Sequence, residues 1–255
     1  MESLGFLGTG TITRAIIEGL NAKGRHAGKI IVSPRSEPIS AQLAKRFECV
    51  KVASDNQGVV DASNIVFLAV RPQVAQTIIS ELKFRADQEI VSFLAATPRS
   101  SVQSWVDAPA KITQAIPLPF VADALGATVI CPPNDTIAAI FDGLGAVIQV
   151  DDETSLNLFF AGSALMGTYF GLLETASQWL QAEGLSETVA STYLRQLFAG
   201  LNKVVMDGGN FASERHNHST KGGLNEQLYR VFSENGGGTA LEKGLSSVLQ
   251  RLSAK

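Results

Sequence analysis

The chain has 255 residues, of which 45% are hydrophobic and 18% are charged, and its formal net charge is −3. This length and composition predict a globular protein of one or two domains and exclude a disordered chain. The sequence has no run of Lys and Arg of the kind that follows a phosphate backbone, so we expect no nucleic-acid partner.

The two cysteines, Cys49 and Cys131, are too few for a disulfide framework and favour a reducing compartment. At the N-terminus, no basic segment precedes a long apolar stretch as it would in a signal peptide. No uninterrupted apolar run approaches the roughly 18 residues of a membrane-spanning helix. We therefore expect a cytoplasmic protein without a membrane partner.

Short apolar runs alternate with amphipathic stretches over residues 1–150. The apolar runs predict strands over Leu4–Leu7, Lys29–Ser33, Cys49–Val52, Ile65–Val70, Ile90–Leu94, Lys111–Ile116, Ala127–Ile130 and Ala146–Val150. The stretches between them predict helices over Thr11–Lys23, Ile39–Phe47, Ser54–Ala62, from Pro72 onward, Ser100–Val106 and Asn134–Leu144. The pattern Ser-x-x-Gln at Ser54 and at Ser100 fits a capping box. This alternation predicts an α/β fold, a Rossmann-type doubly wound parallel sheet with helices on both faces.

From Asp151 onward the strand signals stop and the pattern becomes helical. Helices are predicted over Thr154–Ala182, Leu185–Met206, Leu224–Ser233 and from a capping box at Thr239 to Leu252. We therefore expect a nucleotide-binding domain over residues 1–150 and an all-α helical domain over residues 151–255. Small residues in the first long helix allow close packing, either within the chain or between the subunits of a homodimer.

The sequence Gly8-Thr9-Gly10 follows the first predicted strand and precedes the first predicted helix. This is the context of the dinucleotide fingerprint G-x-G-x-x-G, whose glycines let the backbone approach a pyrophosphate at a helix N-terminus. The third glycine position holds Thr13. From these residues alone, an ordinary strand-to-helix turn therefore remains an alternative.

The end of the second predicted strand, VSPRS, has no acidic residue to bind a ribose 2′-hydroxyl. It carries Ser33, Arg35 and Ser36, and a guanidinium beside two hydroxyls suits a 2′-phosphate. The pattern favours NADP as the cofactor, and a solvated loop arginine is the alternative. The segment FLAVRPQ (Phe67–Gln73) ends the fourth strand, where the backbone of an open α/β sheet lines the ligand crevice.

Five segments, in the order GFLGTGTITRAIIEGL, IIVSPRS, DNQGVV, IVFLAVRPQ and VSFLAA, resemble the pyrroline-5-carboxylate reductase family. The resemblance covers the whole chain in domain order and is tightest over these segments. It implies an NAD(P)H-dependent imine reductase that makes proline from Δ1-pyrroline-5-carboxylate. It also implies a Rossmann domain followed by a helical dimerisation domain that takes part in binding the small-molecule substrate.

The resemblance assigns cofactor contacts to four groups of residues. The pyrophosphate would be held by Gly8, Thr9, Gly10, Thr11, Ile12 and Thr13. The adenosine 2′-phosphate would meet Ser33, Arg35 and Ser36, and the adenine ribose would lie near Asn56. The nicotinamide ribose would lie beside Ala69, Val70, Arg71 and Pro72, with Arg71 in place of the family's usual lysine.

The segments that hold the substrate in the family are altered here. The family's M-P-N-T-P reads IPLPF (Ile116–Phe120), with Leu118 at the asparagine position. Its S-G-S-G-P-A-Y reads AGSALMG (Ala161–Gly167), and its S-P-G-G-T-T reads TKGGLN (Thr220–Asn225), without both threonines. Because the cofactor half is kept and the substrate half is rewritten, we expect a related reductase with a different substrate.

Polar residues that would serve the chemistry gather in RHNHSTKGGLNEQ (Arg215–Gln227). Lys221 would bind a substrate carboxylate or act as an acid, and Asn225 would hydrogen-bond the substrate. Solvated surface is the plain alternative for both. Ser163 would contact the substrate from the first long helix, and a hydrogen bond to that helix's own backbone is the alternative.

Two other functions stay open. A β-hydroxyacid-dehydrogenase-like carbonyl reductase shares the two-domain plan, but it usually carries a lysine in a long helix of the second domain, and Thr154–Ala182 has none. A regulatory or sensing module that binds the cofactor without catalysis would also account for the altered segments. A metal site is not expected, because His216 and His218 have no further ligands at a suitable spacing.

Overall fold

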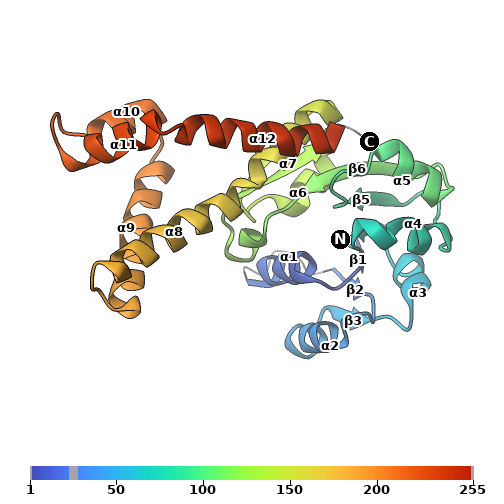
Figure 1. The fold of residues 1–255 in the computed structure, drawn as a ribbon. Coiled ribbons are helices and arrows are strands. Elements are labelled where there is room, and N and C mark those ends of the chain that lie inside the picture. Colours follow the sequence, from blue (N-terminus) through green and yellow to red (C-terminus); the bar gives the residue numbers. More distant parts are fainter. Residues whose placement is uncertain (1, 23–27, 254–255) are drawn as a thin grey trace. The chain divides into compact units, whose positions relative to one another are not determined.

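The computed structural model describes residues 2–22 and 28–253 (Figure 1). It divides into two compact units, one made of residues 1–160 and 249–255 and the other of residues 161–248. The first unit carries the sheet, and the second is entirely helical. Lys23, the expected last residue of the first helix, lies outside the described residues.

The first unit is built on one eight-stranded sheet in the order β3-β2-β1-β4-β5-β6-β7-β8. The strands are β1 (Leu4–Leu7), β2 (Ile30–Val32), β3 (Val50–Val52), β4 (Ile65–Leu68), β5 (Glu89–Ser92), β6 (Lys111–Ile116), β7 (Ala127–Cys131) and β8 (Ala146–Gln149). Neighbouring strands are parallel except β6 and β7, which are antiparallel. The predicted α/β fold with a doubly wound, mostly parallel sheet is confirmed.

Helices cover both faces of this sheet (Figure 1). They are α1 (Thr11–Ala22), α2 (Glu37–Arg46), α3 (Asn56–Asp61), α4 (Pro72–Ser80), α5 (Arg99–Val106), the 3₁₀ turn η1 (Pro119–Asp123), α6 (Asp135–Phe141) and α7 (Glu153–Ser163). Because the strands are buried on both faces, successive residues enter two separate cores. Phe6 and Phe67 stack at 4.6 Å in one core, whereas Leu7 and Leu68 lie in the other.

The structure corrects the predicted capping boxes. In α3 the cap is Asp55, whose carboxylate accepts a hydrogen bond from Gly58 N at 2.7 Å. A carboxylate is a stronger acceptor than the Ser54 hydroxyl, and the positive end of a helix favours it. Helix α5 begins after Pro98 without a side-chain cap, so Ser100 is already inside the helix.

In the second unit the helices are α8 (Leu165–Ala182), α9 (Glu187–Met206), α10 (Phe211–Asn217), α11 (Leu224–Glu234) and α12 (Gly237–Ser253). The helix predicted over residues 154–182 divides at Ala164, where Ala164 N donates to Ala161 O and Gly167 N donates to Ala164 O. These three-residue hydrogen bonds are a local tightening of the helix. The last helix starts at Gly237, so the predicted capping residue Thr239 already lies inside it. Gly237 has no side chain, and a Cβ there would collide with the Phe232 ring.

The stretch Glu153–Ala182 combines α7 and α8, and by length and composition it qualifies as a membrane-spanning helix. Its mean hydropathy is 1.4 over the most apolar window, and 11% of that window is buried. No uninterrupted apolar run covers this stretch, because polar residues such as Asn157 and Glu174 divide it.

Candidate functional site

The candidate site lies at the carboxyl edge of the sheet, next to β1. Strand β1 pairs with β2 on one side and with β4 on the other, so the strand order reverses direction there. In open α/β sheets, ligands bind at such a switch point, outside the carboxyl ends of the strands. The turn Gly8–Gly10 leaves β1 at this point and leads directly into α1.

The two glycines of this turn lack a side chain for different structural reasons. Gly8 has a φ of 102°. A Cβ there would lie 2.5 Å from the carbonyl oxygen of Ala69, which directly follows the neighbouring strand β4. A Cβ on Gly10 would meet no protein atom within 4 Å, so the space above it is open. The first hydrogen bond inside α1 runs from Arg14 N to Gly10 O at 3.0 Å. The N–H groups before it therefore have no partner within the helix and can bind an anion such as a pyrophosphate.

Thr13 stabilises this turn from inside the protein. Its side chain is fully buried, and its hydroxyl donates to the carbonyl oxygen of Gly8 at 2.6 Å. A glycine or alanine at this position would leave that carbonyl without this donor. The departure from G-x-G-x-x-G is thus compatible with a nucleotide-binding turn, and it adds a hydrogen bond across it.

Ser33 also supports the turn. Its hydroxyl accepts a hydrogen bond from Gly8 N at 3.0 Å, and its carbonyl oxygen accepts one from the Thr9 hydroxyl at 2.8 Å. Both side chains are buried. The Ser33 hydroxyl is thereby engaged within the protein, which leaves the exposed residues Arg35 and Ser36 as the side chains available to a 2′-phosphate. Ser36 has a left-handed φ of 69°, an uncommon conformation that clusters at functional sites.

The remaining residues assigned to the cofactor lie on the same edge of the sheet. Asn56 is half-buried and opens α3, just after β3. Ala69 and Val70 are half-buried and directly follow β4, and Ala69 N donates to Leu7 O at 2.8 Å. Arg71 is exposed at the N-cap of α4, and Pro72 is the first residue of that helix, as predicted.

The proposed substrate-side residues belong to the second unit. Ser163 is the last residue of α7, and Lys221 is exposed in the turn before α11. The Asn225 side-chain amide donates to the carbonyl oxygen of His218 at 2.7 Å, and Glu226 accepts a hydrogen bond from Gly222 N at 2.6 Å. Asn225 and Glu226 therefore hold the Thr220–Gly223 turn in place. Among the described residues, no group of three or more His, Cys, Asp or Glu is arranged to hold a metal ion.

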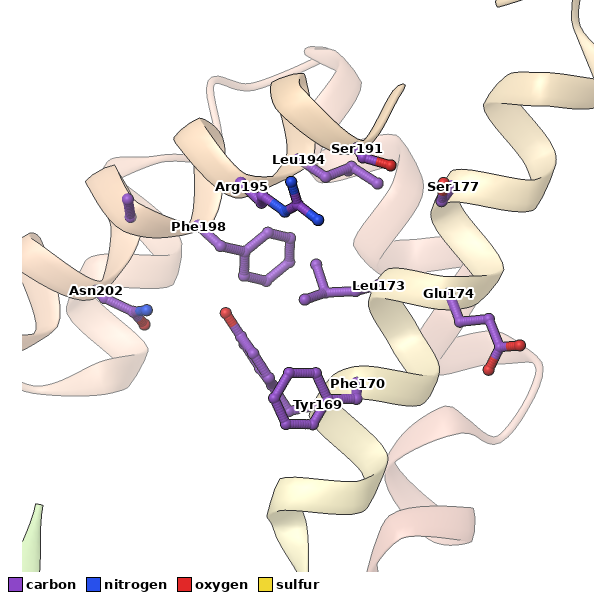
Figure 2. Close-up of a pocket in the computed structure, with 11 residues that line it drawn as sticks. Tyr169, Phe170, Leu173, Glu174, Ser177, Ser191, Leu194, Arg195, Phe198 and Asn202 are labelled. Carbon is purple, nitrogen blue, oxygen red and sulfur yellow. The ribbon is translucent and has the colours of Figure 1, made fainter. Parts of the chain in front are cut away.

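A hollow of ≈ 460 Å³ between α8 and α9 was not predicted from the sequence. Figure 2 shows Tyr169 and Leu173 of α8 facing Arg195 and Phe198 of α9 across it. Tyr169 and Phe198 meet edge to face, with 5.5 Å between their ring centroids. The signal in the sequence was the recurrence of aromatic residues along two consecutive helices, which indicates an apolar face but not its occupant.

The fold and the turn define an NAD(P)-binding α/β domain that is followed by an all-helical domain. Residues 3–96 match the family described as "NADP oxidoreductase coenzyme F420-dependent". Residues 153–254 match the family described as "Pyrroline-5-carboxylate reductase dimerisation". The chain belongs to the pyrroline-5-carboxylate reductase family of NAD(P)-dependent reductases.

Full-length relatives agree with this assignment. A pyrroline-5-carboxylate reductase of Pseudomonas aeruginosa is 26% identical over 259 residues, covering 97% of this chain and 94% of the relative. The fold is shared with a solved 1-pyrroline-5-carboxylate reductase of Streptococcus pyogenes, with a TM-score of 0.84 at 17% identity over 100% of this chain and 99% of that one. It is also shared with a Plasmodium falciparum pyrroline carboxylate reductase solved with NADP bound, with a TM-score of 0.83 at 18% identity over 99% of this chain and 97% of that one.

The family assignment also explains the long apolar stretch. All of Glu153–Ala182 falls in the part of the chain that matches the dimerisation family. It is a helix pair of that domain and not a membrane span.

Proposed function

We propose that this protein is a cytoplasmic, homodimeric, NADPH-dependent reductase of C=N bonds whose substrate differs from pyrroline-5-carboxylate. The observation that carries the proposal is a nucleotide-binding turn at the switch point of a chain that aligns over 97% of its length with a pyrroline-5-carboxylate reductase. The altered segments around Leu118, Ala164 and Lys221 support a changed substrate. The reference for this change of substrate is the reduction of pyrroline-5-carboxylate to proline.

In this proposal the open cradle over Gly10 receives the pyrophosphate. Its contacts are the backbone and side chains of Gly8, Thr9, Gly10, Thr11 and Ile12. Arg35 and Ser36 bind the 2′-phosphate, since a guanidinium pairs with phosphate by two hydrogen bonds, and Ser33 positions the turn beneath them. The two riboses are contacted by Asn56, Ala69, Val70, Arg71 and Pro72. When bound, the nicotinamide supplies the hydride, and the chain's own task is to orient it and to exclude water.

Three residues are proposed for the substrate side. Asn225 is oriented by its bond to the His218 carbonyl, so its side-chain oxygen can accept a hydrogen bond from a substrate N–H. Lys221 delivers a proton or binds an anionic group of the substrate, and Ser163 hydrogen-bonds the substrate from the end of α7. No metal takes part in this scheme.

If Lys221 serves as the proton donor and not as an anion-binding group, the Glu226 carboxylate at the start of α11 favours a less anionic substrate than pyrroline-5-carboxylate. The carboxylate of Glu226 already accepts the Gly222 N–H in the turn whose counterpart holds the substrate carboxylate according to the family resemblance. A second carboxylate there would be repelled unless Lys221 offsets the charge. The balance between Lys221 and Glu226 thus selects the charge of the substrate.

The cofactor half of the proposal is tested by titrating the protein with NADPH and NADH while following fluorescence. We expect NADPH to bind more tightly, and Arg35→Ala to weaken NADPH binding by about tenfold while leaving NADH unchanged. Lys45→Ala, which removes an exposed cation further along α2, serves as the matched control. Tighter or equal binding of NADH would show that Arg35 does not read a 2′-phosphate.

The substrate half is tested with a panel that pairs pyrroline-5-carboxylate with 1-pyrroline, together with other imines and carbonyl compounds. We expect kcat/KM to favour the uncharged imine, and Glu226→Gln to shift the preference toward the carboxylate. Full activity on pyrroline-5-carboxylate would show that the substrate is unchanged. Tight NADPH binding with no turnover on any compound would favour the sensing module, and turnover of carbonyls alone would favour the carbonyl reductase.

A further inference from the structure

Gln114 on β6 has one side-chain atom whose hydrogen bond is missing. The side chain is only 4% exposed. Its amide nitrogen donates to the carbonyl oxygen of Thr97 at 2.9 Å, which fixes the orientation of the amide. Its oxygen, Oε1, is buried and has no hydrogen-bond partner within the described chain. Since nearly all buried polar atoms of native proteins are paired, this oxygen points to a donor that the chain itself does not supply.

The sheet register places Gln114 on the edge that binds the nucleotide. Leu7 pairs with Leu68, Leu68 with Ser92, and Ser92 with Gln114, so the four residues form one row across β1, β4, β5 and β6. Leu7 directly precedes the glycine turn. Three strand spacings of about 4.8 Å put Gln114 roughly 14 Å along the edge from β1. This is the half of the doubly wound sheet that receives the second mononucleotide, on the opposite side of β1 from β2.

A small cavity of ≈ 30 Å³ adjoins Gln114 in the first unit. Its other lining residues are Ala96, Thr97, Pro98, Glu153, Asn157, Phe160 and Leu252. This space suits one small polar group but not a ring. Ala96 at its rim has a left-handed φ of 55°, which is costly for a residue with a Cβ and is found mainly where surrounding structure or function requires it.

We propose that Gln114 Oε1 accepts a hydrogen bond from an N–H of the bound reactants, in first place from the carboxamide of the nicotinamide. This inference rests on the proposed function, because it requires a nicotinamide nucleotide at the edge of the sheet. The protonated C=N nitrogen of the substrate offers the same donor chemistry. A primary amide donor matches the neutral oxygen of Gln114, and it fits the cavity that the Ala96–Pro98 loop borders. In this role Gln114 positions a reactant and anchors that loop at the same time.

The test compares the binding of NADP with that of its 3-acetylpyridine analogue, in which a methyl ketone replaces the carboxamide and removes the N–H. We expect the wild-type protein to bind NADP about fivefold more tightly than the analogue, the effect of one hydrogen bond. Gln114→Met, which has a similar shape without an acceptor oxygen, is expected to bind the two equally. Gln114→Glu, which keeps an acceptor at this position, is expected to retain the preference. Gln103→Met, an exposed glutamine of α5, is the matched control.

The outcomes separate the possible donors. Equal binding of both nucleotides by the wild type removes the carboxamide as the donor, even if a variant fails to fold. If Gln114→Met then raises KM for the imine without changing nucleotide affinity, the donor is the substrate nitrogen. If neither quantity changes, Oε1 binds only water and the proposal is wrong. A wild-type protein that binds neither nucleotide contradicts the proposed function itself and not the role of Gln114.

Discussion

The two units of this chain bury their apolar residues in different ways. In the first unit, large side chains such as Phe6, Phe67 and Leu68 are fully buried in the cores of the sheet. In the described part of residues 161–248, the buried apolar side chains are only Ala161, Ala190 and Leu194. Exposed side chains of that unit include Phe170 at 62%, Trp179 at 62% and Phe211 at 75%.

This difference shows that the nucleotide-binding unit closes its own core, whereas the helical unit leaves its apolar faces for another surface. A monomer in water would not leave so much aromatic surface exposed without a binding role. The match of this region to a dimerisation family fits a second copy of the chain as the covering surface.

The largest effect is expected at the glycine turn of the first unit. Gly8→Ala places a methyl group 2.5 Å from the Ala69 carbonyl in a left-handed conformation, and we expect it to lower the free energy of unfolding by about 3 kcal/mol. Gly10→Ala meets no protein atom, so stability should stay within about 0.5 kcal/mol while NADPH affinity falls at least about tenfold. Chemical denaturation and nucleotide titration of both variants check this. If Gly10→Ala binds NADPH normally, the open space above the turn is not the pyrophosphate cradle.

A smaller effect is expected at the exposed aromatic surface of the second unit. Phe170→Asp puts a charge on the α8 face beside the hollow of Figure 2, and we expect it to weaken dimerisation by about 30-fold, as for the loss of an interface hot spot. Analytical ultracentrifugation over a concentration series measures this change. The matched control is Leu125→Asp, the same kind of change at a residue of the first unit that is 55% exposed. A wild-type protein that is monomeric at all concentrations would remove the contrast between the units.

The sequence predicted the first unit better than the second, for physical reasons. Buried parallel strands read as apolar runs, and the predicted strand Lys111–Ile116 matches β6 at both ends. Helix starts were less predictable, because several polar residues compete as caps, as Ser54 and Asp55 do in α3. In the helical unit, the division at Ala164 depends on local backbone hydrogen bonds that no periodic pattern encodes.

In the candidate site, too, local features could be predicted and features that depend on tertiary structure could not. The glycine turn could be predicted, because its spacing and its strand-to-helix context are local. The hydrogen bond from Gly8 N to the Ser33 hydroxyl could not, since it depends on β1 and β2 ending side by side. The Thr13 hydroxyl bonds the nearby Gly8 carbonyl, but the fingerprint pattern reads that position only as a missing glycine. Gln114 was missed altogether, because only the register of four strands places it on the same edge as Gly8.

A smaller effect than the loss of dimerisation is expected for Thr13→Val, which keeps the shape of the side chain and removes its hydroxyl. The Gly8 carbonyl loses its buried donor, so we expect the free energy of unfolding to fall by about 1 kcal/mol. NADPH affinity should fall as well, because the turn is less firmly held. Thr11→Val, at an exposed position on the same helix, is the control for stability. An unchanged unfolding midpoint for Thr13→Val would mean that the hydrogen bond at 2.6 Å adds nothing to the turn.

The smallest effect is expected at Asp152, where the chain enters the helices of the dimerisation region. Its carboxylate accepts a hydrogen bond from Ser155 N at 2.8 Å, and this bond holds the pKa of the Asp152 carboxyl below its ordinary value of 3.8. Because the folded state favours the charged form, the contribution to stability is complete above pH 3.8 and disappears as the pH falls through the lowered pKa. We therefore expect the unfolding midpoints of the wild type and Asp152→Asn to differ slightly at neutral pH and to converge in acid, with Asp151→Asn as the matched control. A difference that persists or grows below that range would mean that the start of α7 is held by contacts other than this carboxylate.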